Sequence, residues 1–275
     1  MTTTWSELLH PGDDNDFFDR AVLPPFDPEL TTYDRDNAWW LAELSRLVYR
    51  HDVGEKDART PSRQSFLAKA GLRELEFFDG PKYRGQAILV QAETWAAVVF
   101  RGTEQEIGDF AADLADLHVK SDPNVVDVHS GFERQLEEIW QKIVAELDKL
   151  TCPIFYTGHS LGAALATLAA ARRPPRATYA FGSPLVGNDA FARANARLPI
   201  HRIVGGRDIV TVVPPPRFGF VHVGTEHRIG VAKTKPALSV TILRVLRTIM
   251  RIHKQPPAYL ADHAPKNYVR GLTES

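Results

Sequence analysis

The stretch from residue 154 to 170 reads IFYTGHSLGAALATLAA, and it decides the fold. It begins with β-branched and aromatic residues, continues through two glycines that enclose Ser160, and ends in an alanine-rich run. This order predicts a strand, a sharp turn and a helix. The wider stretch 150–171 carries no charged side chain, but Pro153 and the glycines interrupt it. We therefore interpret it as a buried strand and helix and not as a membrane span.

Periodic patterns extend this unit in both directions along the chain. The expected strands are 76–78, 87–91, 96–100, 154–157, 177–181 and 201–204. Apolar residues at helical spacing predict one helix that begins after Asp36 and another between Phe132 and Leu147. Strands that alternate with helices predict the α/β class, with a mostly parallel sheet that helices cover on both faces.

The composition is typical of one globular domain. The chain has 275 residues, of which 44% are apolar and 24% charged, and we find no repeat or linker that divides it. We expect one domain over 1–275, with 1–36 as an irregular N-terminal arm and 231–258 as a basic helical insertion. Cys152 is the single cysteine, which excludes an intrachain disulfide and leaves metal sites of the paired-cysteine kind without ligands.

The charge is nearly balanced overall but not along the chain. A net charge of −1 gives no global attraction for nucleic acid, so we expect no nucleic-acid partner. Residues 1–37 have a balance of −7, whereas the chain from 231 onward has a balance of +6. The first residues show no basic flank followed by an apolar run, so we expect no cleaved secretory signal and favour a cytoplasmic location.

Ser160 is the candidate nucleophile, because GHSLG is a G-x-S-x-G sequence with a strand expected before it and a helix after it. A serine on so sharp a turn has its hydroxyl above the sheet edge, and glycines flank it because a Cβ would collide with neighbouring backbone. The backbone N–H of Leu161, at the helix start, would then face an oxyanion formed at Ser160. The alternative is a serine that only caps the helix.

A serine hydroxyl is a weak nucleophile by itself, so a base and an orienting acid are expected after it in the chain. Asp208 follows an expected strand and is the preferred acid, because catalytic loops lie at the carboxyl ends of parallel strands. Asp189 is the alternative acid, but we expect it to cap a helix. His263 lies in a loop near the C-terminus and is the preferred base. His222 is the alternative, although GFVHVG around it alternates as a strand does.

A second oxyanion donor should come from a loop after an earlier strand. FRGT, residues 100–103, closes the expected strand 96–100 and offers the hydroxyl and the backbone N–H of Thr103. The alternative is that Thr103 caps a helix, and this role is compatible with the first because both need a turn at the end of the strand. Such a serine mechanism requires no metal and no organic cofactor, and we expect neither.

In their order along the chain, these motifs resemble those of the class 3 lipases, the family of fungal triacylglycerol lipases and their relatives. Besides GHSLG and FRGT, the resemblance rests on LAELSRLVY (41–49), DFAADL (109–114), HSGF (129–132), FGSPLVGN (181–188), RIVGGRDIVTVVPP (202–215), HVG (222–224) and DHAPKNYV (262–269). It implies an α/β-hydrolase fold with a helical lid, and it makes Ser160 the nucleophile, Asp208 the acid and His263 the base. Thr103 and Leu161 would form the oxyanion hole.

The chain departs from the family pattern at some positions. Phe110 stands where the family usually has tryptophan, and Leu185 where arginine is frequent. We expect neither the signal nor the disulfides of the secreted fungal members. These departures leave the expected chemistry intact. They argue against carrying over the extracellular location and the triglyceride preference of the fungal members to this chain.

Two amphipathic segments bear on the substrate. The segment 104–117 corresponds to the family's lid, and its apolar face consists of Ile107, Phe110, Ala111, Leu114 and Leu117. From the pattern alone, a permanently packed surface helix fits as well as a mobile cover. A second helix is expected to gather Arg244, Arg247, Arg251 and Lys254 on one side. Such a basic face fits an anionic membrane surface, but a solvated face of a packed helix is the preferred interpretation.

We therefore expect a serine carboxylic ester hydrolase that acts on lipid acyl esters. The sequence defines the reaction centre but not the acyl pocket, so a phospholipase and a short-chain esterase are alternatives. A catalytically silent module that binds a membrane or a partner through its basic helix is the alternative outside enzymes. A lipid ester is the expected partner, with peripheral contact to an anionic membrane or lipid droplet as a hypothesis; the oligomeric state is left open.

Overall fold

The computed structural model describes residues 3–50, 61–102, 125–215, 218–230 and 255–273. Its strands form one sheet in the order β1-β2-β3-β4-β5-β6-β7. They are β1 (Arg73–Asp79), β2 (Gln86–Gln91), β3 (Ala96–Phe100), β4 (Ile154–His159), β5 (Ala177–Phe181), β6 (Ile200–Gly205) and β7 (Thr225–Ile229). The first two pairings are antiparallel and the four from β3 to β7 are parallel. The expectation of a mostly parallel sheet is confirmed.

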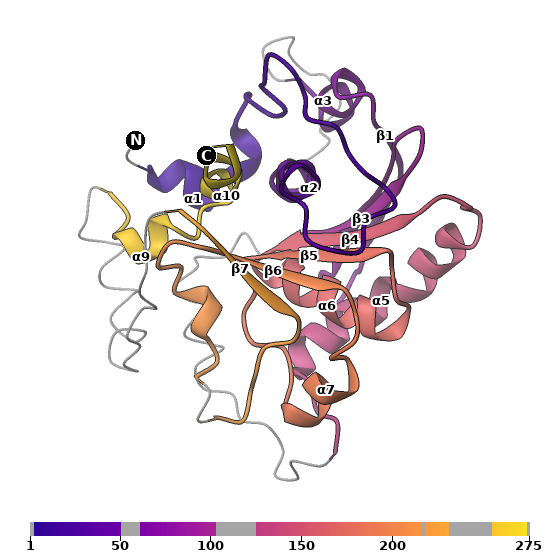
Figure 1. Cartoon of the computed structure of the whole chain (residues 1–275), viewed down its shortest axis with the longest axis vertical. Coiled ribbons are helices and arrows are strands. Elements are labelled where there is room, and N and C mark those ends of the chain that lie inside the picture. The colour runs from indigo at the N-terminus through magenta and orange to yellow at the C-terminus, as the bar shows by residue number, and fades with distance from the viewer. Residues whose placement is uncertain (1–2, 51–60, 103–124, 216–217, 231–254, 274–275) are drawn as a thin grey trace.

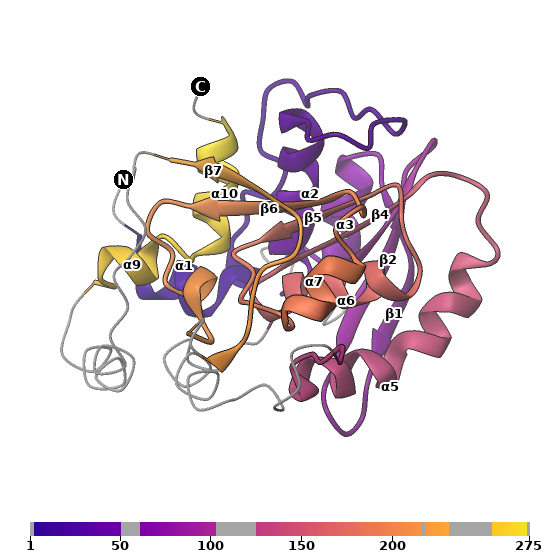
Figure 2. The same ribbon diagram turned by 60° about the horizontal axis from the view of Figure 1, so that its bottom comes forward.

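Helices cover both faces of this sheet, as Figures 1 and 2 show. On one face lie α1 (Trp5–Leu9), α2 (Arg35–Leu47), α3 (Arg63–Lys69) and α10 (Pro265–Thr273). On the other lie α5 (Ser130–Leu147), α6 (Leu161–Arg172) and α7 (Asp189–Ala194). Three short helices complete the described elements: the 3-10 helices η1 (Pro11–Asp13) and η2 (Val210–Val212), and α9 (Ala258–Ala261). Among the described elements, no helix is long and apolar enough to cross a membrane.

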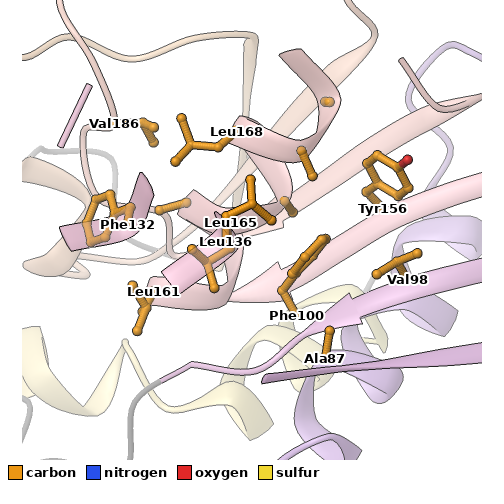
Figure 3. Packing of buried hydrophobic residues seen from close by; sticks show 14 of the residues in the cluster. Ala87, Val98, Phe100, Phe132, Leu136, Tyr156, Leu161, Leu165, Leu168 and Val186 are labelled. Carbon is orange, nitrogen blue, oxygen red and sulfur yellow. The ribbon is translucent and has the colours of Figure 1, made fainter. Parts of the chain in front are cut away.

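The alternation of side chains along the central strands builds a core on each face. In β4, Tyr156 packs into the cluster under α5 and α6, whereas Phe155 packs into the cluster under α2. Figure 3 shows Phe100 and Tyr156 of the sheet in the same apolar cluster as Leu165 of α6. Helix α6 is buried from Leu161 to Ala170, and its many alanines allow it to lie directly against the sheet. The end of β4 is therefore firmly held on both sides.

The structure differs from the sequence prediction at the N-terminal arm, which we expected to be irregular. Thr4 and Glu7 form a capping box that starts α1. Helix α2 begins at Arg35, with the Asp34 side chain as its N-cap, and not after Asp36. The sequence TWSE contains the S/T-x-x-E signal of such a box, so this helix was detectable. Of the expected basic insertion, residues 231–254 lie outside the described residues, and Ala258 begins α9.

Candidate active site

Ser160 occupies a strained turn between β4 and α6. Its backbone is at φ 60° and ψ −126°, a region that costs a non-glycine residue about 1–3 kcal/mol. Its N–H donates to the carbonyl of Phe181 in β5 at 2.9 Å, which helps to hold that conformation. A Cβ at Gly158 would lie 2.8 Å from the carbonyl oxygen of Phe100, and one at Gly162 would collide with the same oxygen. The two glycines thus allow α6 to approach β3 beside the serine.

The structure brings Ser160, His263 and Asp208 together from distant parts of the chain. The His263 Nε2 lies 2.9 Å from the Ser160 Oγ, and its Nδ1 lies 2.8 Å from the Asp208 Oδ2. All three side chains are buried. Because a carboxylate only accepts, the Nδ1 carries the proton and donates it, and the Nε2 accepts from the serine hydroxyl. This is the geometry of a nucleophile, a base and an orienting acid.

The Asp208 carboxylate is fixed by more than the histidine. It follows β6, and its Oδ1 accepts from the backbone N–H of Val210 at 2.8 Å. Its Oδ2 also accepts from the hydroxyl of Tyr268, on α10, at 2.5 Å. Burial, followed by the charge of Asp208, holds the pKa of Tyr268 well above its usual range, so this hydroxyl keeps its proton. Sequence reasoning missed Tyr268, because only the tertiary fold brings α10 to Asp208.

The His159 ring, next to the nucleophile, makes its hydrogen bonds to groups other than the Ser160 hydroxyl. Its Nε2 lies 2.7 Å from the backbone carbonyl of His263, and its Nδ1 lies 3.2 Å from the Tyr49 hydroxyl. Burial and the neighbouring His263 keep the pKa of His159 well below its usual range, so the ring is neutral. Since a carbonyl can only accept, the Nε2 donates and the Nδ1 accepts from Tyr49. His159 therefore holds the backbone of the catalytic histidine candidate.

Gly182 packs directly against the side chains of Asp208, His263 and Tyr268. Its φ is +58°, and a Cβ there would lie 2.8 Å from the Asp208 Oδ2, 2.9 Å from the Tyr268 hydroxyl and 3.2 Å from the His263 Cε1. A glycine at this point of FGSP leaves room for the carboxylate and the imidazole.

Leu161 supplies one of the two expected donors of the oxyanion hole. Leu161 is the first residue of α6, so its N–H is one of the helix-start amides that lack an intrahelical acceptor. It lies beside Ser160 and is available to an oxyanion there. Gly102 lies close to the backbone carbonyl of His159. Thr103, the segment 104–117 and the basic residues 244–254 lie outside the described residues.

The two alternative site residues lie elsewhere. Asp189 pairs with Arg193 at 2.7 Å on the surface, and the cap of α7 is Asn188, so the expectation that Asp189 caps this helix is wrong. Asn188 has the extended backbone of an N-cap, and its side chain accepts from the Phe191 N–H. His222 lies before β7, not within a strand, and its Nε2 contacts the carbonyl of Thr211 at 2.8 Å.

Within the described residues, no group of three or more histidine, cysteine, aspartate and glutamate side chains is placed to hold a metal ion. The described groups of the site are the Ser160 hydroxyl, the His263 imidazole, the Asp208 carboxylate and the Leu161 amide.

The parallel sheet, with a glycine-flanked serine turn after a central strand, defines an α/β-hydrolase fold. Residues 97–218 match the family described as lipase (class 3). A lipase of Rhizomucor miehei is 36% identical over 147 residues, which are 47% of this chain and 40% of that protein.

Solved structures agree with this match. The triacylglyceride lipase of Rhizomucor miehei is 30% identical, with a TM-score of 0.50 over 59% of this chain and 68% of that one. A triacylglycerol lipase whose catalytic centre is formed by a serine protease triad is 25% identical, with a TM-score of 0.61 over 83% of this chain and 92% of that one. The chain belongs to the class 3 lipase family. It spans 40% and 37% of the lengths of the lipases of Rhizomucor miehei and Rhizopus niveus.

Proposed function

We propose that this chain is a serine carboxylic ester hydrolase that acts on lipid acyl esters. Two consecutive hydrogen bonds carry the proposal. The His263 imidazole lies 2.9 Å from the Ser160 hydroxyl on one side and 2.8 Å from the Asp208 carboxylate on the other. Membership of a family whose relatives are named lipases supports a lipid ester as the substrate.

In the first half of the reaction, the Ser160 Oγ attacks the ester carbonyl and its proton moves to the His263 Nε2. The carbonyl oxygen becomes an oxyanion, which the N–H of Leu161 stabilises together with the second donor that we assign to Thr103. The tetrahedral intermediate then collapses, the C–O bond to the alcohol breaks, and the His263 proton passes to the departing alcohol. The product is an acyl ester of Ser160.

In the second half, a water molecule gives its proton to His263 and attacks the acyl carbon. Collapse of this second intermediate releases the fatty acid and returns the proton to the Ser160 Oγ. Asp208 stabilises the imidazolium that forms in each half, while Tyr268 and the Val210 N–H hold its carboxylate in place. A fixed, buried carboxylate needs no reorganisation when the imidazole becomes charged.

Ester hydrolysis by purified protein tests this proposal, with a tributyrin emulsion, phosphatidylcholine vesicles and a soluble p-nitrophenyl butyrate as substrates. Ser160→Ala should lower the rate by a factor of about 10⁶, as loss of a triad serine does elsewhere. Ser130→Ala, an exposed serine at the start of α5, is the matched control and should keep full activity. The preferred substrate separates a lipase from a phospholipase and from a short-chain esterase.

Hydrolysis of none of the three esters by the unmodified protein would contradict the proposal and leave a silent binding module as the better interpretation. The cytoplasmic location and the contact of the basic segment with an anionic membrane stay predictions of the sequence.

A further inference from the structure

The N-terminal segment 3–16 packs against α10, as both Figure 1 and Figure 2 show. Glu7 of α1 contacts two cations on α10, Arg270 at 2.9 Å and Lys266 at 3.5 Å. The Asn267 side chain also donates to the Thr3 hydroxyl at 2.8 Å. The acidic start of the sequence and part of its basic end therefore meet in the fold.

The same contacts continue to α2. The Lys266 Nζ lies 2.8 Å from Asp16 and 3.4 Å from Asp14. Asp16 in turn contacts the buried Arg46 of α2 at 2.6 Å. Helix α10 also packs directly on α2, so the segment adds ion pairs to both helices at a contact that they already make.

These ion pairs are partly removed from water, which distinguishes them from ordinary surface pairs. The side chains of Glu7 and Lys266 are each 15% exposed. Burial raises the pKa of Glu7, but the Thr4 amide and the charges of Arg270 and Lys266 outweigh it and lower the pKa below its ordinary value. Burial also disfavours the charge of Lys266, yet Asp16 and Asp14 raise its pKa. The contact therefore favours the charged form of each group despite its partial burial.

Helix α10 carries groups of the proposed active site on its other side. Lys266 and Arg270 are four residues apart and share the face toward α1, whereas Tyr268 lies about 200° around the helix from Lys266. Tyr268 donates to Asp208, and His263 precedes the helix by two residues. A displacement of α10 would therefore move Tyr268 and the adjoining His263, two of the three groups that contact the Asp208 carboxylate.

We propose that segment 3–16 is a positioning element for the ester hydrolysis proposed above, in which Glu7 and Asp16 hold Lys266 and Arg270 and so keep His263 in reach of Ser160. The four charged residues are positioning residues, since none of them contacts the serine, the histidine or Asp208. Small displacements of a base have large effects on rate, about 10² for a misplacement of about 1 Å.

The test compares two double variants that break the contact between segment 3–16 and α10 from opposite sides. Glu7→Gln/Asp16→Asn also removes the capping carboxylate of α1 and the pair with Arg46, whereas Lys266→Gln/Arg270→Gln leaves both in place. Each should lower kcat for a soluble ester by about tenfold or more, with KM little changed, because the base and not the binding surface is displaced. Each should also speed hydrogen exchange of the α10 amides. Lys266→Arg/Arg270→Lys keeps the charges and should restore both readouts.

Arg173→Gln is the matched control, because it removes a surface ion pair with Asp148 that lies away from α10. Unchanged kcat in both double variants, or an equal loss in Arg173→Gln, would overturn the proposal. If the unmodified protein hydrolyses no ester, the proposed function fails. Hydrogen exchange then still tests whether segment 3–16 holds α10 in place. Faster exchange of the α10 amides in the double variants would support this role of the segment, and unchanged exchange would overturn it.

Discussion

Replacement of Gly182 by alanine tests whether the space beside the proposed triad is as tight as the structure shows. The residue has a φ of +58°, so an alanine there would cost about 1–2 kcal/mol in backbone strain. The added Cβ would also lie 2.8 Å from the Asp208 Oδ2 and 2.9 Å from the Tyr268 hydroxyl, closer than real Cβ atoms are found to other heavy atoms. Relief of such overpacking costs about a further 1–3 kcal/mol.

Gly71 provides the matched control, because its φ is +73° but a Cβ there would meet nothing within 4 Å. Gly71→Ala should therefore lose only the strain term of about 1–2 kcal/mol, and Gly182→Ala about 2–5 kcal/mol in all. Urea unfolding followed by tryptophan fluorescence measures both. Displacement of Asp208 or His263 should also lower kcat in Gly182→Ala by about 10–10², and leave it unchanged in Gly71→Ala. Equal stability losses together with full activity in both variants would refute the reasoning.

Three further predictions follow from buried groups. Tyr268→Phe removes a hydrogen bond to a buried carboxylate, so the free energy of unfolding at pH 7 should fall by about 1.5–3 kcal/mol in urea titrations. His222→Ala should cost about 1 kcal/mol of stability while kcat stays unchanged, since its Nε2 contacts the Thr211 carbonyl and not the serine; a large fall in kcat would make His222 the base. Burial lowers the pKa of His129 from 6.5 to about 4, so the unfolded chain takes up a proton that the folded chain does not, and stability is lost as the pH falls below 6.5. His129→Asn keeps a capping acceptor for α5 without a titrating ring, and should lose about 2 kcal/mol less than the unmodified protein between pH 7 and pH 5.

The parts of the site that the sequence predicts are those with local signals. Ser160 is found from the strand, the two glycines and the helix around it, all of which lie within a few residues. The structure places Asp208 and His263 beside it, and their catalytic roles stay proposals. Tyr268 and the hydrogen bond from His159 to His263 have no local signal, because they depend on where α10 packs.

The strands, like the site residues, were predicted where their own sequence carries the signal and missed where only tertiary contacts define them. Strands β3 and β5 match their expected bounds because both are fully buried and read as apolar runs. Strand β7, with the sequence TEHRI, was not expected, because it lies at the sheet edge and carries mostly polar side chains. Its His227 ring stacks on Tyr33 of the N-terminal arm at 4.0 Å, a contact that only the tertiary fold supplies.

The central claim is that His263 and Asp208 activate Ser160 as a nucleophile. A fluorophosphonate tests this most directly, because the serine oxygen displaces fluoride from phosphorus and remains covalently bound, whatever the natural ester is. The protein should be treated with the reagent, digested, and the modified residue located by mass spectrometry. The account predicts one adduct per chain, on Ser160, which is lost in Ser160→Ala and strongly slowed in His263→Ala. An adduct on another residue, or an unmodified Ser160 in folded protein, would contradict it.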